Sequence, residues 1–176
     1  MRGFAKRSNH TILKFGLKSA RQFIMIKTIK SVDDIVSLWS EAFGDSREDI
    51  VFFIENIKNA ICFAYYENNK AVSMLYLVDC VLDGKQSHYI YAACTTEKRR
   101  KKGYMSALIK HCVAEFDEVC LIPANEELIE YYKRQNLTFE YSVDKLKFDE
   151  CRELIDEYLY AGCSLEIPIV LSNKGE

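Results

Sequence analysis

Apolar residues recur every three or four positions in two early segments of the chain, which is the spacing of one face of an α-helix. Ser31 precedes the first segment and has Asp34 three residues after it, the arrangement of a capping box. Ser46 precedes the second segment as a suitable N-cap. The pattern predicts a short strand from Met25 and then two helices, at 31–43 and 46–58.

Three segments rich in β-branched and aromatic residues follow, each with the length of a strand. Glu67, Asn68 and Asn69 separate the first from the second, and Asp83 and Gly84 separate the second from the third. Residues of these types form tight hairpin turns. We expect an antiparallel meander over 60–67, 71–82 and 87–95.

The helical period returns at Gly103, with apolar residues at Met105, Leu108, Ile109 and Cys112. A continuous apolar run then predicts a short buried strand, and Asn125 is a suitable N-cap for the next helix. The later elements are therefore a helix at 103–116, a strand at 118–124, a helix at 125–136, and strands at 137–148 and 164–171 around a candidate helix at 149–160.

This order contains one β-α-β unit beside antiparallel strands. It predicts an α+β fold, with a mixed, mostly antiparallel central sheet and helices on both of its faces. The chain has 176 residues and 49% hydrophobic composition, enough for the core of one domain, which we place at 25–176.

Residues 1–24 contain lysines and arginines but no acid. A transit peptide has this composition, but such peptides are usually also rich in serine. A disordered basic arm, or a misassigned start that precedes the true one at Met25, is therefore favoured. The sequence has no secretory apolar region and no apolar run near the roughly 18 residues of a membrane span, so we expect a cytoplasmic location and no membrane partner.

The net charge of −2 gives no overall attraction for nucleic acid, so any basic site must be local. Seven cysteines form an odd count without the spacing of a zinc site, so reduced thiols within the core are expected, and no metal. The local exception in charge is a run of five basic residues, Lys98 to Lys102, directly before Gly103.

The junction at Gly103 predicts an anion site. The first N–H groups of a helix lack intrahelical partners, and with the helix dipole they attract phosphate. Glycine lets the main chain approach the ligand closely, and the basic run raises the local potential. A basic run alone is more often a solvated turn or a nucleic-acid patch, but this one leads directly into a core helix. A diphosphate fits best.

From Arg100 to Ile109 the sequence RKKGYMSALI resembles the acyl-CoA-binding motif of the GNAT N-acetyltransferase superfamily, Q/R-x-x-G-x-G/A, at the start of its central helix. Asn125 and Tyr132 in NEELIEYYKRQNLTF are spaced like the asparagine and tyrosine of the family segment N-x-x-A-x-x-x-Y-E-K-L-G-F. The resemblance covers about residues 25–147, and the two motifs in order, with a strand between them, are specific together.

The resemblance implies a site for acetyl-CoA built from three segments. Backbone N–H groups hold the diphosphate, main-chain groups of a strand bind the pantetheine, and Asn125 caps its helix close to the pantetheine. The residues implied are Arg100, Lys101, Lys102, Gly103, Tyr104, Met105 and Ser106 for the diphosphate, Ala93, Cys94 and Thr95 for the pantetheine, and Asn125.

Under the same resemblance Tyr132 is the general acid that protonates the departing CoA thiolate. A phenol with a pKa of about 10 is protonated at neutral pH and can serve as this donor. A core tyrosine is the alternative for Tyr132, and Tyr131 faces another side of the helix. Cys94 is an alternative nucleophile, but no histidine partner is evident, so an inert buried thiol is expected.

Three departures from the family pattern concern the cofactor site and the second helix. Met105 stands where a small residue is usual, but the apolar stripe places its side chain toward the core. Lys101 stands where glycine is frequent. Asn136 and Leu137 replace Gly-Phe, and asparagine tolerates the left-handed conformation of a helix stop.

The turn between the first two helices is acidic and borders the acceptor site in the resembling family. Its carboxylates could attract a cationic amine, although helix capping explains them equally well. They are Glu41, Asp45, Glu48 and Asp49.

The sequence thus favours an N-acetyltransferase that moves an acetyl group from acetyl-CoA to a primary amine by direct attack. The acceptor is a small-molecule amine or an amine of a peptide or protein, and the pattern does not indicate the oligomeric state. Two other classes remain open: a catalytically silent CoA-binding or regulatory module, and a nucleic-acid-binding protein that uses residues 98–102.

Overall fold

A computed structural model describes residues 25–57, 59–148 and 162–175, and it confirms the predicted α+β fold. The helices are α1 (Val32–Phe43), α2 (Arg47–Asn56), α3 (Tyr104–Glu115) and α4 (Glu126–Lys133), with short 3-10 turns at Glu97–Arg99 and Val143–Lys145. The strands are β1 (Met25–Thr28), β2 (Ala60–Glu67), β3 (Lys70–Leu82), β4 (Lys85–Thr95), β5 (Val119–Leu121), β6 (Phe139–Ser142), β7 (Leu146–Lys147) and β8 (Ile169–Ser172). The predicted N-terminal extension at 1–24 and the candidate helix at 149–160 lie outside the described residues.

The first two helices begin where their capping residues predict. The Asp34 N–H donates to the Ser31 hydroxyl at 3.3 Å, and the Asp49 N–H donates to the Ser46 hydroxyl at 3.1 Å. Gly44, with φ +82°, ends α1 in the left-handed conformation. The two helices therefore stay separate and are joined by a short turn at residues 44–46.

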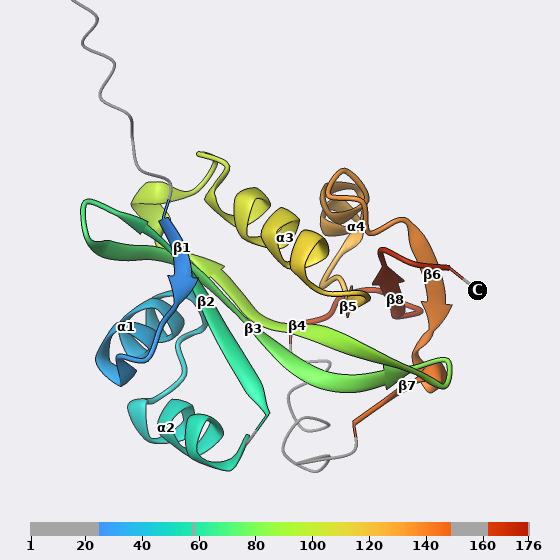
Figure 1. The fold of residues 1–176 in the computed structure, drawn as a ribbon, viewed down its shortest axis with the longest axis horizontal. Coiled ribbons are helices and arrows are strands. Elements are labelled where there is room, and N and C mark those ends of the chain that lie inside the picture. Colours follow the sequence, from blue (N-terminus) through green and yellow to red (C-terminus); the bar gives the residue numbers. More distant parts are fainter. Residues whose placement is uncertain (1–24, 58, 149–161, 176) are drawn as a thin grey trace, which may run out of the picture.

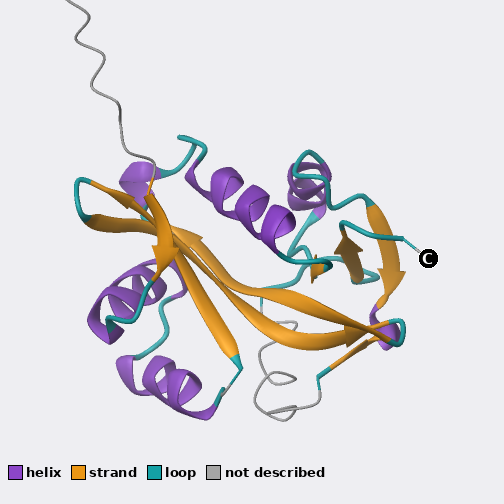
Figure 2. Cartoon of the chain, viewed as in Figure 1, coloured by secondary structure: helices purple, strands orange, loops and turns teal. Residues whose placement is uncertain are grey.

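The two hairpin turns were predicted correctly. Asn68 and Asn69 have φ of 51° and 62°, and Asp83 and Gly84 have φ of 47° and 78°. Positive φ at both central residues is the geometry of a type I′ turn, whose twist matches that of the flanking strands. The turns fix β2, β3 and β4 as an antiparallel meander (Figure 2).

The described strands form one sheet in the order β1-β2-β3-β4-β5-β8-β6, with β7 paired to β3. All pairs are antiparallel except β4 with β5, which is the pair joined through α3. Helices α1 and α2 lie on one face of the sheet, and α3 and α4 lie on the other (Figure 1). Fully buried side chains fill both sides, among them Ile50 from α2, Leu75 from β3 and Leu108 from α3.

The parallel pair β4–β5 is short and then opens. Only two register pairs join it, His88 with Val119 and Tyr89 with Cys120. Beyond them β4 contains a β-bulge, because one extra residue stands between the pairs that join Tyr91 and Cys94 to β3. Ala92, at this bulge, has φ +48°. The two strands thus diverge on the side of the bulge.

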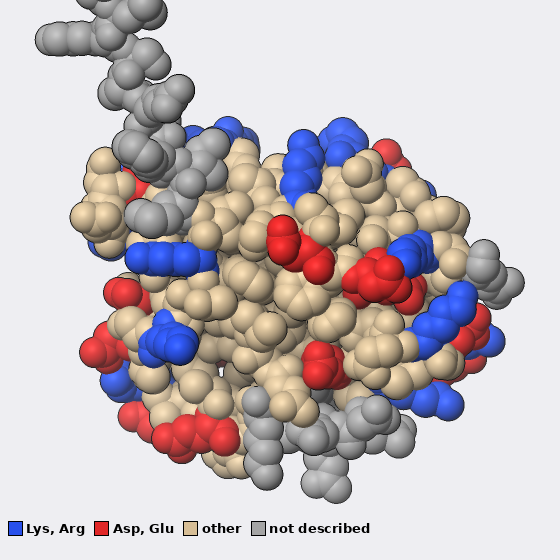
Figure 3. All heavy atoms as spheres, viewed as in Figure 1, with Lys and Arg blue, Asp and Glu red and all other residues tan. Residues whose placement is uncertain are grey.

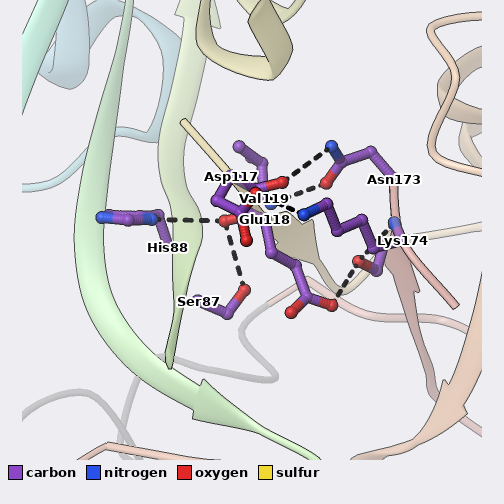
Figure 4. A network of polar contacts seen from close by, with 8 residues as sticks. Ser87, His88, Asp117, Glu118, Val119, Asn173 and Lys174 are labelled. Atoms are coloured by element: carbon purple, nitrogen blue, oxygen red, sulfur yellow. Dashed lines mark hydrogen bonds and ion pairs between the residues drawn. The ribbon is translucent and has the colours of Figure 1, made fainter. Parts of the chain in front are cut away.

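A polar network holds the other end of the pair together (Figure 4). The buried Glu118 accepts a hydrogen bond from the Ser172 hydroxyl at 2.9 Å, and its carbonyl oxygen accepts one from the His88 N–H at 3.0 Å. The Val119 N–H donates to the Asn173 side chain at 2.7 Å. Strands β4, β5 and β8 are therefore fixed at one end while β4 and β5 separate at the other.

The C-terminal part differs from the prediction in two respects. Residues 137–148 form two short strands around a 3-10 turn, and only β6 pairs with β8, while β7 joins β3. Strand β8 begins at Ile169, directly after Pro168, because proline has no N–H for a sheet ladder. Five of the described cysteines are buried as expected, namely Cys62, Cys80, Cys94, Cys112 and Cys120. None of the helices in the described ranges is long and apolar enough to span a membrane.

Candidate functional site

The turn before α3 presents a row of backbone N–H groups. Lys101 has φ +62° and Gly103, the N-cap of α3, has φ +83°. The first bond into the helix runs from the Ala107 N–H to the Gly103 carbonyl at 3.0 Å. Within the described ranges, no atom accepts a hydrogen bond from the N–H groups of residues 101–106. The N–H of Arg100 already donates to the Glu97 carbonyl at 3.2 Å. The row of open donors therefore begins at Lys101.

Three basic residues at the start of this row form no ion pair with a described carboxylate. Arg100, Lys101 and Lys102 are exposed, and no described acid lies within ion-pair distance of them. Figure 3 shows several lysine and arginine side chains along the edge of the molecule where Figure 1 places α3 and α4, with an acidic side chain beside them near α4. The turn is thus locally positive in a chain with a net charge of −2.

Two carboxylates anchor the turn to the rest of the fold. Glu67, at the end of β2, accepts a hydrogen bond from the Tyr104 hydroxyl at 2.6 Å and pairs with Arg99 at 2.5 Å. The Tyr104 hydrogen bond is the main cause that holds the pKa of Glu67 below its usual value. Glu41 of α1 accepts a hydrogen bond from the Glu97 N–H at 2.8 Å. Glu67 was not singled out in the sequence, because its partners lie more than 30 residues away.

The end of β4 is held by contacts with β3. The Ser73 hydroxyl donates to the Cys94 carbonyl at 3.0 Å and lies 2.7 Å from the Thr95 hydroxyl. Cys94 is 5% exposed, and burial raises the pKa of its thiol to about 12. Ala93, just after the bulged residue Ala92, has no register partner on β3 and lines a cavity.

Helix α4 carries Asn125, Tyr131 and Tyr132. The Asn125 side chain accepts a hydrogen bond from the Leu128 N–H at 2.9 Å, so it caps α4 as predicted. The Tyr131 hydroxyl lies 3.1 Å from the Ser106 hydroxyl in the first turn of α3. Tyr132 lines the cavity, and its hydroxyl has no hydrogen-bond partner among the described residues. Burial, and next the neighbouring Tyr131, raise the pKa of Tyr132 to about 12.

The cavity has a volume of about 380 Å³ and is built from both faces of the sheet. Trp39 and Phe43 come from α1 on one face, and Leu128 and Tyr132 come from α4 on the other. The remaining walls come mainly from β4 and from β5 and the residues after it. The cavity therefore lies at the opening between these two strands.

The structure places some of the predicted site residues close together and gives others a different contact from the one predicted. Ala93 and Tyr132 line one cavity, and the Ser106–Tyr131 contact joins the turn before α3 to α4. Met105 packs partly buried against the core, as the apolar stripe predicted, and Asn136 has φ +71°. Of the four acids in and around the turn between α1 and α2, only Asp45 lines this cavity, while the Asp49 N–H donates to the N-cap Ser46 and Glu41 accepts from the Glu97 N–H.

The aromatic wall of the cavity was missed in the sequence. Trp39 and Tyr91 belong to the apolar patterns of a helix and a strand, and such patterns do not distinguish a core position from a cavity wall. The cavity depends on the bulge at Ala92, where β4 separates from β5, and the sequence pattern did not predict this bulge.

The sheet is mixed and opens beside a β-bulge, and helix N–H groups without partners lie at one end of this opening. These features define an α+β fold of the type found in the acyltransferases that the sequence motifs resemble. Among proteins of known structure, the fold is similar to an acetyltransferase from Bacillus subtilis in complex with CoA, with a TM-score of 0.57, 12% identity, and coverage of 87% of this chain and 99% of that one.

Two other structures have the same fold, with similar TM-scores and sequence identities. An aminoglycoside 6′-N-acetyltransferase from Acinetobacter haemolyticus gives a TM-score of 0.54 at 18% identity, over 66% of this chain and 90% of that one. A probable N-acyltransferase from Enterococcus faecalis gives 0.53 at 15% identity, over 66% of this chain and 33% of that one. The chain thus spans only a third of the length of the Enterococcus protein.

The family model for the acetyltransferase (GNAT) domain matches residues 26–141. The chain belongs to the GNAT acetyltransferase family. A search of curated proteins finds no match.

Proposed function

We propose that the chain is an N-acetyltransferase that transfers the acetyl group of acetyl-CoA to a primary amine by direct attack. The observation that carries this proposal is the row of open N–H groups at residues 101–106, set between unpaired cations and joined through the Ser106–Tyr131 contact to the helix that presents Tyr132. Membership of the GNAT family and the CoA bound in the Bacillus subtilis structure support it.

The start of α3 binds the diphosphate of CoA. Its open N–H groups and the helix dipole favour an anion, and φ +83° at Gly103 turns the chain so that successive N–H groups point out of the turn. The basic side chains, which form no ion pair with a described carboxylate, add positive charge that attracts the phosphates. The residues that take part are Arg100, Lys101, Lys102, Gly103, Tyr104, Met105 and Ser106.

The pantetheine arm lies in the opening between β4 and β5. Ala93, Cys94 and Thr95 bind it with main-chain groups on the β4 side, in the manner of an added strand. Asn125 lies at the start of α4, on the other side of the opening. An N–H group at the bulge stabilises the oxyanion that forms when the thioester carbonyl is attacked, because it is not required by the ladder to β3.

The substrate ammonium releases one proton to solvent, and the neutral nitrogen attacks the thioester carbonyl carbon. The carbon–sulfur bond then breaks, and the sulfur takes the proton of the Tyr132 phenol. The nitrogen of the adduct gives up its second proton, which restores the phenol. The products are the amide, the CoA thiol and one proton in solvent.

The raised pKa of Tyr132 suits this role. A group with a pKa of about 12 is protonated at neutral and mildly alkaline pH, where a small fraction of an amine acceptor is already neutral. In the cavity, where little water competes, its hydrogen bond to the departing sulfur is stronger than in bulk solvent. The Tyr132 hydroxyl therefore keeps its proton in this pH range and can donate it to the departing sulfur.

The test compares Tyr132→Phe with the matched variant Tyr131→Phe. Positioned general acids contribute about 10²–10⁴-fold, so we expect Tyr132→Phe to lower kcat by at least about 100-fold while acetyl-CoA still raises the melting temperature. Tyr131→Phe should retain most of the turnover. Ligand at 100 times its Kd adds about 2.7 kcal/mol of stability, which a melting assay detects.

Three outcomes would contradict the proposal. Equal acetylation rates in Tyr132→Phe and the unaltered protein would remove Tyr132 from the chemistry. Thermal stabilisation by acetyl-CoA without turnover in either protein would favour a silent CoA-binding module. Stabilisation by an oligonucleotide but not by acetyl-CoA would instead favour nucleic-acid binding by residues 98–102.

A further inference from the structure

The cavity at the opening of the sheet combines aromatic side chains with one carboxylate. Trp39, Phe43, Tyr89 and Tyr91 contribute rings in addition to Tyr132, and the other described lining residues are aliphatic or glycine apart from Asp45. Asp45 is therefore the one charged side chain among the described lining residues. The composition of the cavity limits the kind of molecule that fits it.

Asp45 is held in place but has no cationic partner. The Trp39 indole N–H donates to Oδ2 of Asp45 at 2.6 Å, and Trp39 is 4% exposed. Oδ1 of Asp45 has no hydrogen-bond partner within the described ranges, and no described lysine, arginine or histidine lies within ion-pair distance of this carboxylate. This carboxylate is therefore available to a positively charged group of a ligand.

The rings around Asp45 are fixed by their neighbours. The Trp39 and Tyr91 rings meet edge to face at 5.8 Å, and Phe53 stacks on Tyr91 at 4.9 Å with an interplanar angle of 12°. Rigid aromatic faces contact apolar and aromatic groups over a large area, and they also attract an ammonium group. Ring faces beside a single carboxylate suit a molecule that has one positive charge and an apolar body.

We infer that the acyl acceptor is a small primary amine with a single positive charge and an aromatic or similarly apolar body, and that Asp45 binds its ammonium group. This inference rests on the proposed acetyl transfer, since Tyr132 and Ala93 line the same cavity. The volume of about 380 Å³ is at the low end of the range of about 300–1,000 Å³ for small-molecule sites. A polycationic acceptor would need further carboxylates, which the described lining does not provide.

The first experiment is a thiol-release assay with saturating acetyl-CoA and four acceptors. We expect kcat/KM for 2-phenylethylamine to exceed that for spermidine, an aminoglycoside and a lysine-containing peptide by at least about tenfold, which corresponds to 1.4 kcal/mol. Higher kcat/KM for any of the other three would overturn the inference. The proposed acetyl transfer would then still stand.

The second experiment tests Asp45 itself with Asp45→Asn. The amide oxygen can still accept the Trp39 hydrogen bond, so the variant removes charge and little else. We expect KM for 2-phenylethylamine to rise at least about tenfold, while inhibition by the uncharged 2-phenylethanol stays unchanged. Asp33→Asn, on the exposed surface of α1 and away from the cavity, is the charge control and should leave KM unaltered.

The outcomes separate this inference from the proposed function. An unchanged KM in Asp45→Asn, or a stabilising acetyl-CoA shift without turnover of 2-phenylethylamine, overturns the assigned acceptor. Absence of both an acetyl-CoA melting shift and thiol release with every amine overturns the acetyl transfer itself, and the acceptor with it.

Discussion

Tyr131 and Tyr132 are consecutive residues of α4, yet their hydroxyl groups have different surroundings. The Tyr131 hydroxyl contacts Ser106 at 3.1 Å, whereas Tyr132 lines the cavity at the opening of the sheet. Their rings lie 5.2 Å apart at an interplanar angle of 68°. One tyrosine joins α4 to the first turn of α3, and the other is directed to the cavity.

The Tyr131–Ser106 contact should act on stability and on binding of acetyl-CoA rather than on the chemical step. We expect Tyr131→Phe and Ser106→Ala each to lower the free energy of unfolding by about 0.5–1.5 kcal/mol, as for a typical hydrogen bond. The double variant should lose less than the sum, because both changes remove one contact. Urea denaturation measures these values, and strictly additive losses would show that the two hydroxyls are not coupled.

Gly103→Ala should weaken the binding of CoA. An alanine at φ +83° costs about 1–2 kcal/mol, although its Cβ would meet no atom within 4 Å. The backbone can relieve this strain only by rotating the N–H groups that follow. Titration calorimetry with CoA should therefore show a higher Kd.

Gly84→Ala is the matched control for this prediction. Gly84 has φ +78° in the β3–β4 turn and an equally open surrounding. Both variants should lose similar stability, but only Gly103→Ala should lose affinity for CoA. An equal loss of affinity in the two variants would point to global destabilisation instead.

Glu67 should make stability dependent on pH in the acid range. The hydrogen bond from Tyr104 lowers its pKa in the folded chain, so its contribution is fully present above the pKa of the unfolded chain and is lost as the pH falls through the folded pKa. We expect the unaltered protein to melt at a higher temperature than Glu67→Gln at about pH 7, and the difference to shrink below about pH 4. The exposed Glu55→Gln controls for the loss of one negative charge. A difference that stays constant down to about pH 3 would contradict this account.

Cys94→Ala should retain most of the turnover. The raised pKa of the buried Cys94 leaves almost no thiolate at neutral pH, and only the thiolate is a strong nucleophile. Mass spectrometry of the protein incubated with acetyl-CoA alone should detect no acetylated Cys94. An acetylated thiol that is discharged on adding amine would replace direct attack with an acyl-enzyme route.

Much of the fold could be predicted because short local motifs determine where its helices and strands begin and end. The asparagine pair at 68–69 and the Asp-Gly pair at 83–84 define two turns with little help from the rest of the chain. Ser31, Ser46 and Asn125 start three helices for the same reason. The tail was harder, because whether residues 146–147 pair with β3 or with β8 depends on contacts between distant segments.

The candidate site could be predicted where it follows a local motif and not where it depends on tertiary contacts. The turn at Gly103 and the spacing from Asn125 to Tyr132 are visible in the sequence. The Trp39–Asp45 hydrogen bond depends on which aromatic ring faces the cavity. The contact of Glu67 with the turn depends on segments that meet only after folding. The positive φ at Ala92 has no residue signature either, since alanine rarely adopts it.

The cavity is lined by helices from opposite faces of the sheet, and this has a consequence for the order of events in the proposed reaction. Donor and acceptor can arrive by separate routes, because the turn before α3 lies on one side and the rings of α1 lie on the other. In the proposed reaction, binding of one molecule therefore does not block binding of the other. In the proposed reaction, the acyl group passes from donor to acceptor at the opening between β4 and β5, where the cavity meets both faces of the sheet.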